Sequence, residues 1–177
     1  MKKSILFIAI FAITLMSSTQ IAGQAFKDLD KSPMDAAAYP SSYKESDKIV
    51  KVVYSRPQLK GREVAKLAPA GKVWRTGANE AAEITFYRDV TFGGKAVKAG
   101  TYSLFTIPSE EGDWTVIINT ARNVWGSYFY KEDQDVVRVS GAVAKSEKNI
   151  EAFSILFDKE MTLKMGWGNI VVSVPIQ

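Results

Sequence analysis

The segment from Gly71 to Ala81, GKVWRTGANEA, gathers side chains that could bind or transform a small molecule. Arg75 could hold an anion, Asn79 could hydrogen-bond a polar ligand, and Glu80 could act as a general base or a metal ligand. Loops carried on a rigid β scaffold often hold functional residues. The segment is therefore the first candidate site of the chain.

The same residues also suit the construction of a turn. Trp74 would supply a stacking face in a site, but it also fits a core or edge position. Gly77 would supply a turn residue with positive φ, and Asn79 can bond to the backbone in an Asx-type turn. Arg75 and Glu80 can also pair with each other. Residue types alone leave the binding and the structural interpretations open.

Basic residues are in excess between Tyr54 and Glu80, where Glu63 is the one intervening acid. The basic side chains are Arg56, Lys60, Arg62, Lys66, Lys72 and Arg75. Such an excess between strands could hold phosphate, sulfate or a carboxylate, and the alternative is a solvated loop. Arg56 and Arg62 therefore join the candidate ligand-binding residues.

Trp125 is the aromatic candidate for ligand contact. It lies in a loop between Asn123 and Gly126, where an exposed ring could stack on a sugar. Trp114 and Trp167 instead fall on apolar faces of predicted strands, so we expect them in the core.

The chain contains no His and no Cys. Ser-His-Asp and Cys-His nucleophile arrangements and the usual Cys/His zinc sites are therefore excluded within it. The acidic run YKEDQD lacks the spacing of a calcium loop, so we expect no metal site. No phosphate-binding Gly loop or dinucleotide fingerprint is present, so we expect no cofactor.

The N-terminus predicts a cleaved signal peptide over residues 1–23, because Lys2 and Lys3 precede an apolar run from Ile5 to Met16 and a small-residue exit. As a helix this run would be about 18 Å long, against about 30 Å of membrane hydrocarbon. We therefore expect a periplasmic or secreted protein that does not span the membrane after cleavage. The net charge of +4 includes the two leader lysines, so we expect no nucleic-acid binding. The sequence does not indicate an oligomeric state.

After the predicted leader, residues 24–47 indicate an extended arm and residues 48–177 a single domain with period-two alternation. Strands are expected over 48–55, 83–89, 101–107, 114–119, 135–143, 151–157, 161–167 and 169–176, with a short one near 95–97. Gly93-Gly94 predicts a two-residue hairpin, and GREVAKL predicts one short helical turn. Short strands without helices between them predict an all-β fold, an antiparallel two-sheet β-sandwich of eight to nine strands, jelly-roll-like or Greek-key.

Several segments, in order, resemble the exported bacterial domain of unknown function 2911 family. They are VYSRPQLKGR, GKVWRTGANEA, VTFGGKAVKAGTYSLFTIP, and WGSY followed by DVVRV. The resemblance covers about residues 32–176 and implies an exported single β domain. It implies no activity, so no catalytic residue is carried over.

Three functions stay open. We favour a binding module for a small anionic or carbohydrate ligand, using the basic and polar loop residues. The alternatives are a hydrolase or lyase with Glu80 as general base beside Arg75, and a structural or protein-interaction domain of the cell envelope. The absence of a catalytic motif disfavours an enzyme.

Overall fold

The computed structural model describes residues 26–177, and the predicted signal peptide lies outside this range. The chain divides into two units after Asp30, and the described residues of the first, 26–30, have no regular secondary structure. All that follows concerns the unit Lys31–Gln177. No helix within residues 26–177 has both the length and the apolar character needed to cross a membrane.

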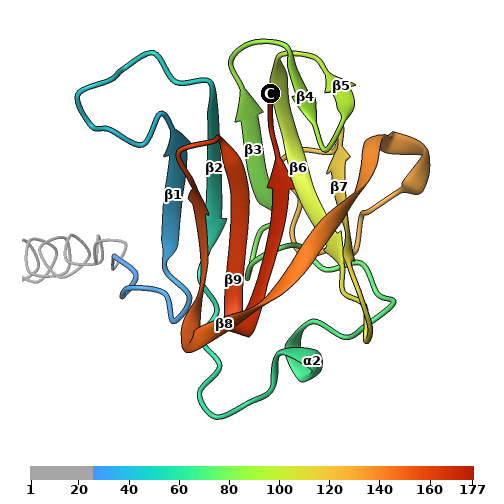
Figure 1. Ribbon diagram of the computed structural model, residues 1–177. Helices are drawn as coiled ribbons and strands as arrows, with labels where there is room; N and C mark the ends of the chain where they lie inside the picture. Colours follow the sequence, from blue (N-terminus) through green and yellow to red (C-terminus); the bar gives the residue numbers. More distant parts are fainter. Residues whose placement is uncertain (1–25) are drawn as a thin grey trace, which may run out of the picture. The chain divides into compact units, whose positions relative to one another are not determined.

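Nine β-strands and two short helical turns make up this unit (Figure 1). The strands are β1 (Met34–Tyr39), β2 (Val50–Ser55), β3 (Ala82–Phe86), β4 (Val90–Phe92), β5 (Lys95–Val97), β6 (Gly100–Ile107), β7 (Trp114–Asn119), β8 (Asp135–Phe157) and β9 (Thr162–Pro175). The turns are α2 (Val64–Leu67) and η1 (Glu132–Gln134). β1 falls within the segment predicted as an extended arm.

The all-β antiparallel class predicted from the sequence is confirmed. Seven strands form one sheet in the order β1-β2-β3-β6-β7-β8-β9, and β4 and β5 form a separate hairpin. That hairpin turns at Gly93 and Gly94, both with positive φ, as predicted. Two facing sheets of a sandwich are not found in the described part of the chain, because one long sheet curls over itself.

The curl comes from β8 and β9, which form a single bent hairpin where the alternation predicted four strands. The pairing register of β8 shifts between Lys145 and Ile150 and again between Ile150 and Ser154. Extra residues on one strand bend it and increase its twist. Opposite them, Gly168 has a φ of 58°, and a Cβ there would lie 3.0 Å from the Val64 side chain. We call residues 150–168 the distal half of the hairpin.

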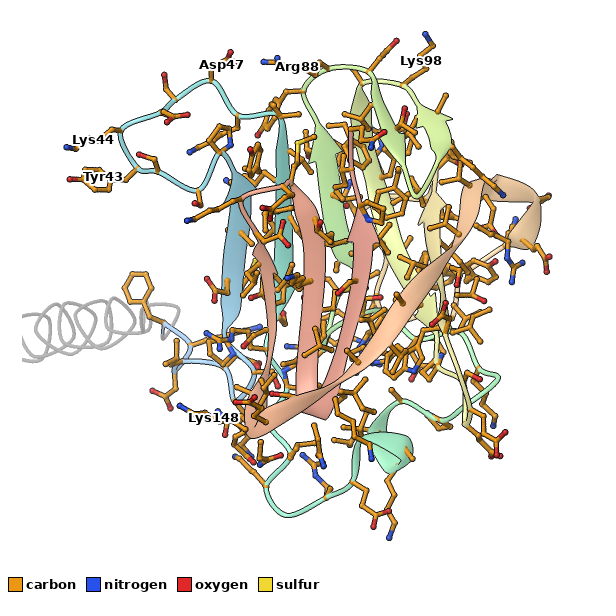
Figure 2. The ribbon with its side chains drawn as sticks, in the orientation of Figure 1. Tyr43, Lys44, Asp47, Arg88, Lys98 and Lys148 are labelled. Atoms are coloured by element: carbon orange, nitrogen blue, oxygen red, sulfur yellow. The ribbon has the colours of Figure 1, made fainter. Side chains whose placement is uncertain are left out.

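The distal half lies across β2 and its following segment and closes the core. The Ile155 N–H donates to the buried Tyr54 hydroxyl at 2.8 Å, and the Phe153 N–H donates to the Pro57 carbonyl at 2.9 Å. Side chains fill the space between the distal half and the rest of the sheet (Figure 2). Trp114 and Trp167 lie in this core, as predicted.

Tyr54→Phe is expected to lower the free energy of unfolding by about 1–3 kcal/mol, because the buried Ile155 N–H would lose its acceptor. Burial also raises the pKa of the Tyr54 hydroxyl above 10.0, so the unfolded chain ionises first as pH rises. The neutral Tyr54 hydroxyl therefore gives its full stabilisation of the folded state below pH 10.0. This stabilisation is lost as the pH rises through the pKa of Tyr54 in the folded state. Urea unfolding at neutral pH and above pH 10.0 measures both effects. Tyr43→Phe, at an exposed ring, is the control, and an equal loss in both variants would contradict the prediction.

Candidate functional site

The segment GKVWRTGANEA leaves the sheet and returns to it beside β6. Trp74 pairs with Thr106 of β6 through two backbone hydrogen bonds, of 2.7 and 3.0 Å. The Ala82 N–H donates to the Arg75 carbonyl oxygen at 3.0 Å, where β3 begins. Residues 76–81 therefore form a loop whose two ends are fixed to each other.

Thr76 and Gly77 shape the start of this loop. Thr76 is fully buried, and its hydroxyl lies 3.2 Å from that of Thr106. Positive φ occurs at Thr76 and Asn79 and not at Gly77, so the turn role predicted for Gly77 is wrong. A Cβ on Gly77 would lie 3.0 Å from the Ser55 carbonyl oxygen, so the close approach of the loop to β2 favours glycine at this position.

Trp74 points into the core and Arg75 away from it. The Trp74 ring stacks on Trp167 with centroids 5.3 Å apart and meets Trp114 and Phe153 edge-on. Successive side chains of an extended segment point to opposite faces. Arg75 therefore faces the outer side of the sheet.

A second loop, between β7 and η1, lies alongside the first. The Gly126 N–H donates to the Asn79 carbonyl and the Ala81 N–H donates to the Val124 carbonyl, both at 2.9 Å. These two bonds form a short antiparallel bridge, which joins loops that are about forty-five residues apart in the sequence.

Glu80 and Trp125 are the pair of residues at the centre of this bridge. Directly opposed residues of an antiparallel pair project to the same side, and a pair without direct hydrogen bonds brings its side chains closer. Glu80 is exposed, and 54% of the Trp125 surface is exposed. The carboxylate and the indole ring therefore share one solvent-facing surface.

An apolar cluster on the outer face of the sheet supports both loops. It contains Ala81, Phe105 and Ile117, with Val73, Ile107, Val124 and Tyr130 packed against it. The Tyr130 hydroxyl donates to the Asp135 carboxylate at 2.7 Å, and the fully buried Asn119 side chain donates to the same carboxylate at 2.8 Å. Sequence patterns did not reveal these anchors, because they join residues from a loop, β7 and β8.

Arg75 is a partly buried cation that has no acidic partner in the described part of the chain. Its Nε atom is buried and has no hydrogen-bond partner, and the side chain forms no ion pair within residues 26–177. Loss of water contact lowers the pKa of Arg75, and the Tyr128 phenol acts in the opposite direction. The Tyr128 ring lies over Gly126, 2.8 Å from where a Cβ would stand. Arg75 therefore lies within electrostatic range of the second loop.

We use the name Arg75 site for Arg75 together with the polar and aromatic residues that the two paired loops carry. Its members are Arg75, Asn79, Glu80, Trp125 and Tyr128. Four of them were predicted as candidates from the sequence. Tyr128, of which 82% is exposed, was noted in the sequence only as an aromatic near Trp125.

Comparison with known proteins gives one finding on this chain. A family model described as protein of unknown function (DUF2911) matches residues 32–176, which include the Arg75 site. The chain belongs to the DUF2911 family. Neither the curated proteins nor the solved structures give a match to it.

In this DUF2911 protein, Arg56 is held by contacts with β1 and β8. Its guanidinium donates to the Phe153 carbonyl at 3.1 Å, to the Ser154 hydroxyl at 2.7 Å and to the Asp35 carboxylate at 3.0 Å. All three partners lie on the strands that Arg56 joins. The Arg56 side chain thus connects β1 with β8 where the sheet closes, and it is not part of the Arg75 site.

Arg62 also binds its own surroundings. It donates to the backbone carbonyls of Leu59 and Gln58 at 2.8 and 2.7 Å. It lines a pocket of about 380 Å³ beside α2, together with Lys145. Arg56, Arg62 and Arg75 therefore lie in separate surroundings, and Arg75 lies within electrostatic range of the second loop.

A pocket of about 200 Å³ shares Glu80 with the Arg75 site. Glu83 also lines it, and the Glu83 carboxylate accepts the Asn123 N–H at 2.7 Å. The DUF2911 protein therefore has a second acid in the pocket of Glu80. Within the described residues, no group of three or more acidic side chains is placed to hold a metal ion.

Proposed function

We propose that this DUF2911 protein is a module that binds a small anionic or carbohydrate ligand, with Arg75 as the residue that contacts the anionic group. The observation that supports it is the buried, unpartnered Nε of Arg75. The other described arginines either bond to protein groups or are exposed: Arg56, Arg62, Arg88, Arg138 and Arg122. Arg75 alone among them combines burial with an unmet hydrogen-bonding capacity.

The energetic argument follows from the chemistry of the guanidinium group. The group carries five N–H donors and stays charged. A buried N–H that has no acceptor lowers the stability of the folded protein by about 1–3 kcal/mol. A carboxylate or phosphate supplies paired acceptors and a compensating charge in the geometry that arginine prefers. An anion bound at the terminal amino groups of Arg75 would therefore supply a compensating charge that the described residues do not supply.

We further propose that the protein acts outside the cytoplasm, in the periplasm or as a secreted protein. Lys2, Lys3 and the apolar run that follows them support export. A module of this kind would meet ligands in the surroundings of the cell.

Arg75→Met is expected to weaken anion binding and at the same time to raise the free energy of unfolding by about 1 kcal/mol. Methionine keeps an unbranched apolar side chain but removes the desolvated charge and the unpartnered N–H. Binding should weaken about 10- to 100-fold, the contribution of hydrogen bonds to a charged group. Calorimetric titration with acetate, phosphate, sulfate and hexuronates measures binding, and urea unfolding measures stability.

Arg122→Met is the matched control, because Arg122 is an exposed arginine of the neighbouring loop. It should change neither quantity. A protein that binds none of these anions, or binds them equally well after Arg75→Met, would disprove the proposed function. A loss of stability in Arg75→Met would identify Arg75 as a brace.

A further inference from the structure

We propose that the ligand of the Arg75 site is an acidic sugar, a uronic acid unit whose carboxylate binds Arg75 and whose ring lies on Trp125. This inference rests on the proposed function, since it needs Arg75 to hold an anion. It adds the chemical class of the ligand, which an unpaired guanidinium does not define.

The Glu80–Trp125 pair carries the argument. The two residues are directly opposed in the bridge between the loops, with Cα atoms about 4.5 Å apart for a pair of this type. Their side chains project to the same side, while the neighbouring Ala81 and Val124 turn to the apolar cluster. The half-exposed indole ring and the Glu80 carboxylate therefore leave the bridge on the same side.

The site contains both a hydrogen-bond donor group and an acceptor group. The Glu80 carboxylate only accepts hydrogen bonds, and the Arg75 guanidinium only donates them. A pyranose ring offers apolar C–H groups on its face and hydroxyl groups, which both donate and accept, around its rim. The indole suits the face, Glu80 suits hydroxyl donors, and the positive charge of Arg75 suits a carboxylate on the same ring.

Other classes of ligand use only part of this arrangement. A simple inorganic anion makes no use of the Trp125 ring and offers Glu80 no hydroxyl donor. A membrane surface that took up the ring would remove the Glu80 carboxylate from water without a partner. A cationic group would suit Glu80 and the aromatic rings, but the unneutralised charge of Arg75 opposes it.

The neutral part of such a ligand could bind in the neighbouring pocket, which Glu80 also lines. Its volume is about 200 Å³. Glu80 and Glu83 supply acceptors in its wall, and Ala81 and Val53 supply apolar surface. It can take hydroxyl groups or an adjoining part of a sugar, and it is too small for a folded partner.

The test is a titration of the protein with glucuronate, trigalacturonate, glucose, acetate and phosphocholine. Trp125 is a selective fluorescent reporter, because the other three tryptophans, Trp74, Trp114 and Trp167, are buried. Uronates should change its emission and bind about tenfold or more tightly than glucose or acetate. Arg75→Met should reduce uronate affinity to that of glucose.

Trp125→Ala, followed by calorimetry, should weaken uronate binding about tenfold, the effect of one stacked ring, and leave acetate binding unchanged. Trp125→Tyr should restore part of the affinity. The matched control is Tyr87→Ala, which removes an equally exposed ring, 53% against 54%, from another part of the sheet. Arg122→Met controls for the loss of a positive charge.

Three results would overturn the inference. If acetate binds as tightly as the uronates and Trp125→Ala has no effect, the protein has an anion site but its ligand is not an acidic sugar. If phosphocholine binds more tightly than the uronates, the ligand class is zwitterionic. If Arg75→Met changes the affinity for no anion, the proposed function fails together with the inference.

Discussion

Trp74→Ala is expected to lower the free energy of unfolding by about 3–5 kcal/mol, the range found when a large core aromatic residue is truncated. Only 5% of Trp74 is exposed, and its ring contacts Trp167, Trp114 and Phe153. The substitution would open a cavity between the curled sheet and the distal half of the hairpin. Urea unfolding followed by far-ultraviolet circular dichroism measures the loss without relying on the deleted fluorophore.

Trp125→Ala is the matched control for this experiment, since it deletes the same ring from an exposed loop. It should change the free energy of unfolding by less than about 0.5 kcal/mol, as most surface substitutions do. Similar losses in the two variants would contradict the separation of roles within the site, in which Trp74 stabilises the fold and Trp125 faces the ligand. Trp74→Phe should retain part of the stability, because it keeps an aromatic ring in the cluster.

Arg56→Met is expected to lower the free energy of unfolding by about 2 kcal/mol. The change would remove the hydrogen bonds to the Phe153 carbonyl and the Ser154 hydroxyl and leave Asp35 without its ion pair. The expected loss is moderate because 35% of the Arg56 side chain is exposed, which screens part of the charge. The midpoint of urea unfolding is the measurement.

The control is Arg88→Met, which breaks the ion pair with Asp47 at 3.1 Å. Both side chains lie in loops at one end of the sheet (Figure 2), and each is more than half exposed. Exposed pairs contribute little, so this variant should lose at most about 1 kcal/mol. If Arg88→Met cost as much as Arg56→Met, the closure of the sheet would not depend on Arg56. Ligand binding by Arg56→Met should be unchanged under folding conditions, because its partners are in β1 and β8.

Much of the strand content could be predicted from alternation, because inward and outward residues of this sheet differ in polarity. Val50 and Val52 alternate with the less buried Lys51 and Val53, and the β2 strand follows from that pattern. The continuity of β8 and β9 could not be predicted. The polar run KSEKN and Gly168 are ordinary turn signals, and in this chain they lie where a continuous hairpin bends.

The site could be predicted as a segment but not as a surface. Arg75, Asn79 and Glu80 could be predicted as candidates because they lie in a dense polar loop. Trp125 could be predicted because it is an aromatic residue in a loop. Their proximity depends on a bridge between Glu80 and Trp125, and no local pattern in either segment encodes such a long-range pairing. Arg56 was predicted as a candidate ligand-binding residue, but the structure places it between two strands. Composition cannot distinguish an arginine that binds a ligand from one that holds two strands together.

The closure of the sheet by the distal half also has a consequence for how the chain folds. Tyr54 and Ile155 are separated by 101 residues, and Arg56 and Phe153 by 97, so the contacts that seal the core have a high contact order. The β8–β9 hairpin joins neighbouring stretches of chain and has a much shorter loop to close. We therefore expect the hairpin to form early and the contacts that seal the core to limit the rate of folding. Until they form, the tryptophan-rich inner surface stays open to solvent.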